Sequence, residues 1–508
     1  MPQPAGDAPA PAAWSAQAST GVAPRRWGRL LALLALVAFG WLTWNYVPHG
    51  IGLSWRECDT QAIARNFLAD GFDPLRPRVD WRGTTDGAVE CEFPLYQLAI
   101  ASVMAVFGED ELPGRLLAML ATVFAGLSLH RLLELRAGPA GAFAGLVTFL
   151  TCGSTVLIAT RVMPDAFSLA LAVASLAAFV RYLGSGSRSA LWLSMIALMF
   201  GGLQKPLALQ VGWMMFGWAC LLAPRRLLDW QLWLGFLVVV GAVAGWLWHG
   251  RALHQETGLT FGVLAEGDSK FPGTEHLLNP KIHAQLAWTT IQHGFSGLGV
   301  MACAALLLRR RLDLADAVML ASVVAALYLS LRYSYHHGMG PHYHSFAAVG
   351  GAWCIARLFG SGVPRWAWLV LLLGVGGQGY WRITEEAHKR SDMVDNPMLD
   401  VAASIRELSM RDELIVVRSE KKRIDDLWKR RNNFEDPRLF YQTRLHGWVV
   451  PADGFDVAKL EELRKDGAAL VFDWAGASPG PTRDWLEANG EVLLDQPRAR
   501  LYRLKSGD

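Results

Sequence analysis

The sequence from Leu30 to Tyr46 reads LLALLALVAFGWLTWNY, and the acidic segment Trp55-Arg56-Glu57-Cys58-Asp59 follows shortly after it. An apolar run of this length approaches the roughly 20 residues that a membrane-spanning helix needs. Ionisable side chains at a membrane boundary are costly in free energy, so they usually mark a functional site. The two neighbouring segments therefore predict a membrane protein whose chemistry takes place beside its first span.

The composition places the chain among proteins that cross a membrane several times. Of its 508 residues, 52% are hydrophobic and only 18% are charged, which is unusual for a soluble globule. The net charge of +3 is small, and no basic stripe interleaved with aromatic residues supports a nucleic-acid partner. Arg25, Arg26 and Arg29 precede the first apolar run without a small-residue cleavage site after it. We therefore expect a retained anchor, preceded by a disordered cytoplasmic tail over residues 1–26.

Hydropathy predicts about eleven transmembrane helices. Their expected limits are 28–48, 113–134, 140–160, 164–183, 189–204, 206–223, 229–249, 289–308, 314–332, 342–359 and 364–381. Arginines gather in alternate connections, so the positive-inside rule places the N-terminus in the cytoplasm and the C-terminus outside. Residues 27–383 form the expected transmembrane domain, with outer loops at 49–112 and 250–288. In a bacterial inner membrane, these loops face the periplasm.

The composition changes after residue 384, where charged residues become dense. Short apolar runs at Leu414–Val417, Ala468–Phe472 and Val492–Leu494 alternate with helical patterns. This alternation is typical of an α/β domain. The predicted fold class is therefore a polytopic α-helical membrane protein with a small extracytoplasmic α/β domain, periplasmic in a bacterium, over residues 384–508.

Two acids in the first outer loop are candidates for acid–base chemistry. Asp59 would begin an amphipathic helix, and in one interpretation its sole role is that of the N-cap. Alternatively, Asp59, with Glu57 beside it, is a general base whose pKa is raised by partial desolvation. The spacing leaves both interpretations open.

A second acidic pair, Glu90 and Glu92, flanks Cys91. Acidic side chains are stabilised near the positive N-terminal end of a helix, which explains the presence of one of these two acids. The functional alternative is a divalent metal held by Glu90 and Glu92. Cys58 and Cys91 both lie in this loop between carboxylates, and an oxidising compartment permits disulfides. We predict a Cys58–Cys91 bridge as a hypothesis, with two unpaired thiols as its alternative.

Cationic and polar residues near the outer ends of later spans are candidates for a substrate phosphate. Asp165 follows Pro164, which fits a helix start, but it also faces the expected outer cavity, where Arg161 could pair with it. Lys205 either extends to the lipid headgroups or holds a phosphate as a point charge.

The densest polar cluster lies at residues 335–344, where histidines would line an anionic pocket or act as ordinary interfacial residues. The candidates for binding the donor phosphate or substrate are Lys205, Arg332, His336, His337, His342, Asp165 and Arg56.

Together these segments resemble the GT-C class of membrane glycosyltransferases, and most closely the protein-mannosyltransferase-like family that includes the lipid A aminoarabinose transferases. The resemblance covers nearly the whole chain and rests on the order of several short motifs. They are Ile63-Ala64-Arg65-Asn66, Glu92-Phe93-Pro94-Leu95-Tyr96, Phe107-Gly108, Gly114-Arg115-Leu116, Pro164-Asp165 and Gly202-Leu203-Gln204-Lys205.

The resemblance implies a sugar donor carried on a polyprenyl phosphate, transfer on the outer face and usually inversion at the anomeric carbon. It also implies an acid in the first outer loop that acts as base or orients the acceptor. Because the family's Asp-Glu pair is altered here, that acid is either Glu57 or Asp59. The family's phosphate-binding lysine is absent where Glu92-Phe93-Pro94 stands, which puts an aminoarabinose donor in doubt.

The expected partners are a polyprenyl-phosphate-linked sugar, the membrane and a lipid, glycan or protein acceptor. The sequence has no nucleotide-binding glycine motif, so the energy for transfer would arrive stored in the donor. No cofactor is clearly required, and a divalent metal is the alternative. A lipid or sugar transporter without transferase activity is the competing function, although transporters usually place charges near the midplane between repeats and no repeat is evident.

Overall fold

The computed structural model describes residues 22–50, 54–263, 278–336, 340–424, 434–474, 480–497 and 499–505, without the side chains of 22–25 and 329–336. The chain divides into two compact units. The helical unit contains Met1–Pro48, Arg115–Gly245 and Phe271–His388. The mixed unit contains His49–Gly114, Trp246–Lys270 and Lys389–Asp508.

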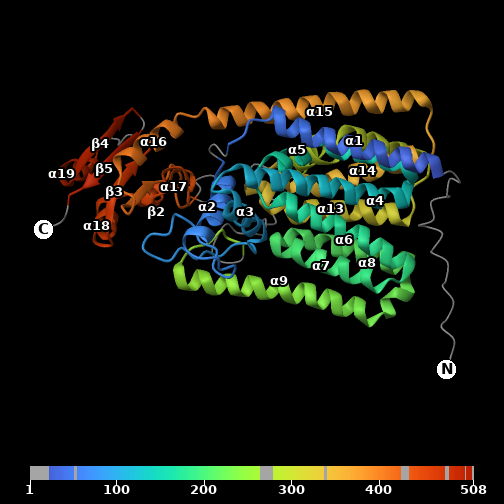
Figure 1. Ribbon diagram of the computed structural model, residues 1–508, viewed down its shortest axis with the longest axis horizontal. Helices are drawn as coiled ribbons and strands as arrows, with labels where there is room; N and C mark the ends of the chain where they lie inside the picture. The colour runs from blue at the N-terminus through green and yellow to red at the C-terminus, as the bar shows by residue number, and fades with distance from the viewer. Residues whose placement is uncertain are drawn as a thin grey trace. The chain divides into compact units, whose positions relative to one another are not determined.

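Long helices that lie side by side build the helical unit (Figure 1). Its helices are α1 (Val22–Tyr46), α4 (Leu112–Leu150), α5 (Gly153–Thr160), α6 (Asp165–Ser185), α7 (Arg188–Gln204), α8 (Val211–Leu222), α9 (Trp230–Thr257), α11 (Pro280–Thr289), α12 (Gly297–Leu308), α13 (Leu314–His336), α14 (Ser345–Gly360) and α15 (Arg365–Val394). The ends of α4, α9 and α15 that pass beyond the unit's ranges belong to the mixed unit. Small and apolar residues of α4, α12, α14 and α15 share one buried cluster that includes Ala144, Leu306 and Leu371.

The apolar helices give the protein its membrane character. Within the described ranges, four helices are long and apolar enough to cross a bilayer: Arg26–Tyr46, Leu112–Leu150, Asp165–Ser185 and Trp230–Thr257. A fifth crossing results if Pro280–Phe295 and Gly297–Leu308, which are bent by 98°, form one broken span. The expected number of about eleven is not confirmed, because several apolar helices are shorter than the roughly 20 residues of a straight span.

The break expected between the spans at 113–134 and 140–160 lies at Gly138. α4, Leu112–Leu150, comprises two helices that meet there, because Gly138 has a φ of 71° and a ψ of 177°, which are not helical. Glycine adopts a positive φ without steric cost, and Pro139 cannot donate a backbone hydrogen bond. The break that the sequence predicts between the two helices is therefore present at Gly138, whereas the second of these helices ends at Leu150 rather than at residue 160.

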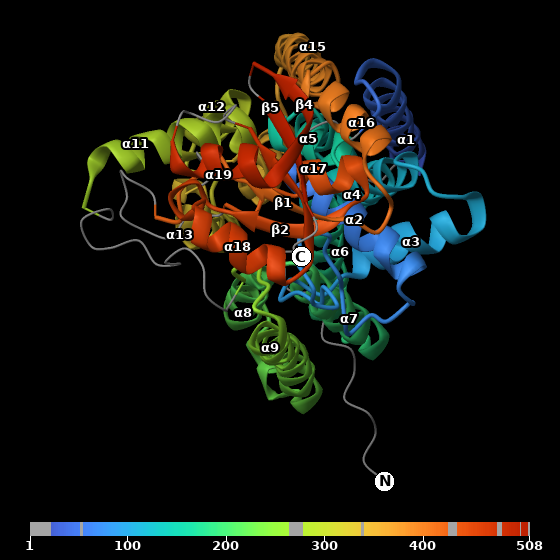
Figure 2. The same cartoon turned by 90° about the vertical axis from the view of Figure 1, so that its left-hand side faces the viewer.

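The mixed unit contains a five-stranded sheet with helices around it (Figure 2). Its elements are α2 (Trp55–Ala69), α3 (Leu95–Phe107), α16 (Met398–Leu408), β1 (Leu414–Arg418), α17 (Arg438–Thr443), β2 (His446–Val450), α18 (Val457–Lys465), β3 (Ala468–Asp473), α19 (Pro481–Asn489), β4 (Gly490–Gln496) and β5 (Ala499–Leu504). The strand order is β2-β1-β3-β5-β4, and β1 runs parallel to both of its neighbours. The predicted α/β fold after the last spans is confirmed in its small C-terminal sheet.

The central strand explains why these residues form a sheet. Ile415 and Val416 are fully buried on opposite faces of β1, as expected for a parallel strand covered on both sides. Ile415 lies opposite Gly447 of β2 and Leu470 of β3. A Cβ atom on Gly447 would lie 1.8 Å from the carbonyl oxygen of Ile415, so this close approach requires glycine.

Residues of the first expected outer loop share the mixed unit with the C-terminal residues. Gly83 donates to the carbonyl of Gly447 at 2.6 Å, and Gly447 donates to that of Asp80 at 3.3 Å. The end of α9 joins them, because Glu90 forms a parallel bridge with Thr260. The protein therefore assembles this unit from three separate parts of the sequence.

A buried ionic cluster closes one end of the helical unit. Asp316, which is fully buried, accepts hydrogen bonds from Trp353 Nε1 at 2.9 Å and Arg357 Nε at 2.9 Å. Arg136 Nη2 lies 3.3 Å from the same carboxylate. The nearby Asp313 also pairs with both arginines, but 43% of its side chain is exposed.

We expect Asp316→Asn to destabilise the protein by about 3 kcal/mol, because it leaves buried guanidinium charge without its partner. Thermal unfolding of the purified protein in detergent would measure the loss. Asp313→Asn is the matched control and should cost less, because the Asp313 side chain is 43% exposed and Asp316 still pairs with both arginines. Equal losses in the two variants would contradict the importance of the buried carboxylate.

Candidate functional site

Helix α2 carries both candidate bases, and almost all of it is buried. It begins at Trp55, so Asp59 lies in its second turn rather than at its N-cap. The N-cap interpretation of Asp59 is therefore wrong, because the helix starts four residues before this side chain. Glu57 and Asp59 are among ten buried residues of α2, which places both side chains away from water.

Asp59 is buried and accepts a hydrogen bond from Trp81. Its side chain is 7% exposed, and Trp81 Nε1 donates to Oδ1 at 3.0 Å. Burial raises the pKa of Asp59 to about 8, although the Trp81 hydrogen bond and the charge of Arg56 oppose the rise. A carboxyl group with this pKa can accept or release a proton near neutral pH, which is what a general base requires.

Glu57 lies in a different environment, although it is only two residues away. It is fully buried and forms an ion pair with Arg390, whose side chain is 1% exposed. Arg390 also donates to the carbonyl of Gly50. Because this buried ion pair joins α2 to a distant part of the chain, Glu57 is suited to positioning α2. No local pattern pointed to Arg390, which lies 333 residues from Glu57.

The predicted Cys58–Cys91 disulfide is wrong. Both residues are buried thiols that form no disulfide. Cys91 Sγ donates to the carbonyl of Glu92 at 3.2 Å, within its own loop. Burial, followed by the charges of neighbouring acids, raises the pKa of both thiols. The carboxylates that suggested a shared site instead disfavour the thiolate forms.

Glu90 and Glu92 are bound to separate groups of the mixed unit. Glu92 pairs with Arg56 at 2.7 Å, and Arg56 also lies over the ring of Phe261 at 5.2 Å. Glu90 accepts hydrogen bonds from Thr260 Oγ1 and, at 3.2 Å, from the Val263 amide. Among the described parts of the chain, no group of three or more His, Cys, Asp and Glu side chains is arranged to hold a metal ion.

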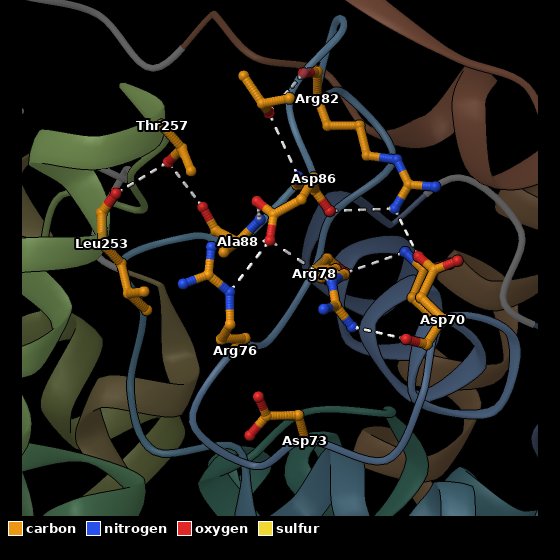
Figure 3. A network of polar contacts seen from close by, with 12 residues as sticks. Asp70, Asp73, Arg76, Arg78, Arg82, Asp86, Ala88, Leu253 and Thr257 are labelled. Carbon is orange, nitrogen blue, oxygen red and sulfur yellow. Dashed lines mark hydrogen bonds and ion pairs between the residues drawn. The ribbon is translucent and has the colours of Figure 1, made fainter.

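Ion pairs fix the loop that leads to Glu90. Arg76 pairs with Asp86 at 2.8 Å and with Glu256 of α9 at 2.6 Å. Thr257 Oγ1 donates to the carbonyl of Ala88 at 2.7 Å (Figure 3). Each exposed pair contributes little by itself, but together these contacts hold residues 76–88 against the end of α9.

A carboxylate that sequence reasoning missed joins α2 to the C-terminal residues. Asp80 is buried and contacts Arg65 at 2.5 Å, Asn66 at 2.9 Å and His446 at 3.6 Å. Burial alone would raise the pKa of Asp80, but Arg65 and His446 outweigh it and hold this pKa well below its ordinary value. Arg65 also lies 5.3 Å from the ring of Tyr441. The Ile63-Ala64-Arg65-Asn66 motif supplies two members of this network, Arg65 and Asn66, but nothing in the sequence indicated that Asp80 is their acidic partner.

The helical unit brings three of the phosphate candidates together. Asp165 and Lys205 form an ion pair at 2.8 Å, and both line a small cavity of about 30 Å³ with His342. Lys205 Nζ also lies 5.4 Å from the ring of Tyr343.

Arg161 pairs with Glu386 at 2.7 Å, and its expected pairing with Asp165 stays a prediction. The side chains of Arg332 and His336, and all of His337, lie outside the described residues.

Comparison with known proteins identifies the architecture. Residues 92–249, which are 158 of the 508, match the family model described as dolichyl-phosphate-mannose-protein mannosyltransferase. The crystal structure of ArnT from Cupriavidus metallidurans in the apo state is similar over 94% of this chain and 98% of its own, with 15% identity and a TM-score of 0.62. The chain has the GT-C fold. The resemblance that the ordered motifs indicated is thus confirmed.

Two further structures with the GT-C fold extend the comparison. ArnT from Cupriavidus metallidurans bound to undecaprenyl phosphate has 15% identity and a TM-score of 0.57, covering 95% of this chain and 98% of its own. The arabinofuranosyltransferase AftD from Mycobacteria has 13% identity and a TM-score of 0.53, covering 95% of this chain and 40% of its own. No curated protein matches the sequence.

The buried position of Asp59 predicts a pH-dependent effect on stability. The folded-state pKa of about 8 lies above the unfolded value of about 4. Between these values the folded protein binds the extra proton, so stability falls as pH rises, and the full penalty is present above pH 8. We expect Asp59→Asn to stabilise the protein by roughly 2–5 kcal/mol at pH 9 and little at pH 4.

Unfolding temperatures between pH 5 and 9 would measure this effect. Asp86→Asn is the control, because the pKa of Asp86 is lowered, chiefly by the Ala88 amide and Arg76 acting against desolvation. This control should show no gain at high pH. Parallel curves for the wild type and Asp59→Asn would contradict the raised pKa.

Proposed function

We propose that the protein is an integral-membrane glycosyltransferase that moves a sugar from a polyprenyl-phosphate donor to an acceptor hydroxyl, with inversion. The observation that carries this proposal is Asp59, a buried carboxyl group with a pKa near 8 in the first outer loop of a GT-C fold. The ArnT structure with bound undecaprenyl phosphate supports a lipid-linked donor.

In the proposed reaction, Asp59 removes the proton of the acceptor hydroxyl as its oxygen attacks the anomeric carbon. A new bond forms between that oxygen and the sugar, while the bond from the sugar to the lipid phosphate breaks. The electron pair leaves with the phosphate, and the proton stays on Asp59 until water removes it. A single displacement of this kind inverts the anomeric centre and needs no covalent intermediate.

Cationic side chains would stabilise the charge of the leaving phosphate. Lys205 is the first candidate, because its ammonium group already binds the carboxylate of Asp165 and can exchange that anion for a phosphate. His342 lines the same small cavity, and Arg56 is the candidate in the mixed unit. Arg332, His336 and His337 remain predictions.

Glu57 is proposed as a positioning residue rather than the base. Its carboxylate forms a buried ion pair with Arg390, and loss of that contact would leave the buried guanidinium without its partner. Asp59 forms no such ion pair with the described residues, and its raised pKa suits the removal of a proton from the acceptor.

Activity measurements should separate the two acids. We expect Asp59→Asn to lower the transfer rate at least about 10²-fold, as removal of a general base does, while the protein remains folded. Glu57→Gln should instead cost about 3–5 kcal/mol of stability. In the wild type, kcat/KM should rise with pH to a plateau above an apparent pKa near 8, because the base must be deprotonated.

The assay would use purified protein in lipid, radiolabelled polyprenyl-phosphate sugars and a membrane extract as the source of acceptor. Full turnover by Asp59→Asn would refute the assignment of the base. Label that crosses the bilayer on its lipid, without transfer, would support the transporter alternative.

The reaction is proposed to need no resident cofactor, because the phosphate-linked donor carries the energy. A divalent metal at Glu90 and Glu92 is the alternative, although Thr260 and Arg56 already bind these acids. We expect activity to survive dialysis against EDTA. The metal site would be established instead if EDTA abolished activity, Mn²⁺ or Mg²⁺ restored the activity of the wild type, and neither ion restored that of Glu90→Gln.

The proposed location is a bacterial inner membrane, with the N-terminus cytoplasmic and the C-terminal domain periplasmic. The distribution of arginines between spans supports this orientation. The proposed acceptor is a lipid, glycan or protein that presents a hydroxyl group on the periplasmic side.

A further inference from the structure

A second cavity lies within the mixed unit, and the proposed chemistry does not use it. Its volume is about 400 Å³, within the range of roughly 300–1,000 Å³ that is typical of small-molecule sites. The walls come from α2, from α17 and from the turn before α4. The side chains that matter here are Gln61, Arg65, Glu109, Glu111, Tyr441 and Arg444.

The walls of this cavity are rich in hydrogen-bond acceptors. Three acids follow one another at Glu109-Asp110-Glu111, and all three contribute to the lining. At the rim, Arg444 pairs with Glu109 at 3.0 Å, and both side chains are substantially exposed. Tyr441 donates its hydroxyl proton to Glu111 Oε1 at 3.2 Å. Such a surface favours a ligand that offers several donors.

Gln61 supplies an acceptor that the protein does not satisfy. Its side chain is 1% exposed, and Nε2 donates to the Glu111 carbonyl at 3.1 Å. Because a backbone carbonyl only accepts, this contact fixes which end of the amide is nitrogen. Oε1 then has no hydrogen-bond partner among the described residues. A buried acceptor without a donor costs about 1–3 kcal/mol, which a ligand hydroxyl or ammonium group would recover.

The cavity lies away from the candidate base. Gln61 and Asp59 are two residues apart on α2, so they project about 200° apart around the helix axis. With its side chains a helix is about 10–12 Å across, and a single sugar ring does not reach both sides. A group bound beside Gln61 therefore belongs to a part of the substrate that is remote from the reacting hydroxyl.

We propose that this cavity binds a saccharide unit of the acceptor, several ångströms from the hydroxyl that is glycosylated. The proposal rests on the transferase function proposed above. It favours the acceptor over the donor because the donor sugar must lie at the reacting centre, whereas an oligosaccharide or glycolipid head group extends beyond it. Binding energy from such a remote unit holds the acceptor in place for the reaction.

Binding of simple sugars to the full-length protein in nanodiscs tests the site directly. The probes are methyl β-D-glucopyranoside and glucosamine, followed by saturation-transfer-difference NMR. We expect saturable binding to the wild type and at least about a tenfold weakening in Gln61→Met. Preference for glucosamine would identify the ammonium group as the main donor, and equal binding would identify the hydroxyls; both outcomes support the site.

The matched control is Gln97→Met on α3. Gln97 is 2% exposed, and its Oε1 also lacks a partner among the described residues, but it does not line the cavity. The Gln97→Met variant should bind the probes as tightly as the wild type does. Arg444→Gln, at the exposed rim, should fold normally and weaken binding several-fold, which keeps the test valid if Gln61→Met fails to fold. Absence of saturable binding to the wild type, or equal binding by all variants, would overturn the proposal.

Kinetics separate this inference from the proposed function. Gln61→Met should raise the KM for the acceptor about tenfold and leave kcat nearly unchanged, whereas Asp59→Asn should lower kcat. If the wild type transfers sugar and Gln61→Met has an unchanged acceptor KM, the subsite is wrong and the transferase stands. If the wild type transfers no sugar, the proposed function fails, and the NMR experiment alone decides whether the cavity binds saccharides.

Discussion

The buried ion pair between Glu57 and Arg390 is the interaction on which the mixed unit depends. Taking a carboxylate and a guanidinium out of water costs several kcal/mol for each ion, and the structure does so with both side chains almost completely buried. Their attraction joins α2 to residues that lie more than 300 positions later in the sequence. Because the pair fixes α2, it also fixes the depth at which Asp59 is desolvated, and hence the pKa on which the proposed chemistry rests.

Charge also determines which acids are suited to reaction and which to structure. Asp80 meets a guanidinium, an amide and an imidazole, so it stays ionised and stabilises the unit. Asp59 meets an indole N–H and otherwise lies among buried groups, so its charged form is disfavoured. Both carboxylates are buried to a similar degree. The neighbouring groups, rather than burial itself, therefore determine that Asp80 stays ionised and has a structural role, whereas Asp59 is able to accept a proton.

The sequence predicted best those features that depend on local pattern. The limits of α6 and α7 follow from their apolar lengths and flanking charges, and the strand cores followed from short apolar runs such as Ala468–Phe472. The pairing of Asp165 with Lys205 was not predicted, although both residues were candidates for one site. The partners of Glu57 and Asp80 could not be predicted, because hydrophobic periodicity carries no information about which distant charges meet. The Cys58–Cys91 prediction failed for the same reason, since spacing in a loop does not determine where two side chains point.

The two buried thiols of the mixed unit have a practical consequence for labelling. Maleimides and related reagents attack thiolates, and Cys58 and Cys91 are both shielded from solvent and disfavoured in that form. A cysteine introduced on the exposed rim, for instance in place of Arg444, would therefore react far ahead of these native thiols. Fluorescent or spin labels could then report on this unit while Cys58 and Cys91 are left in place.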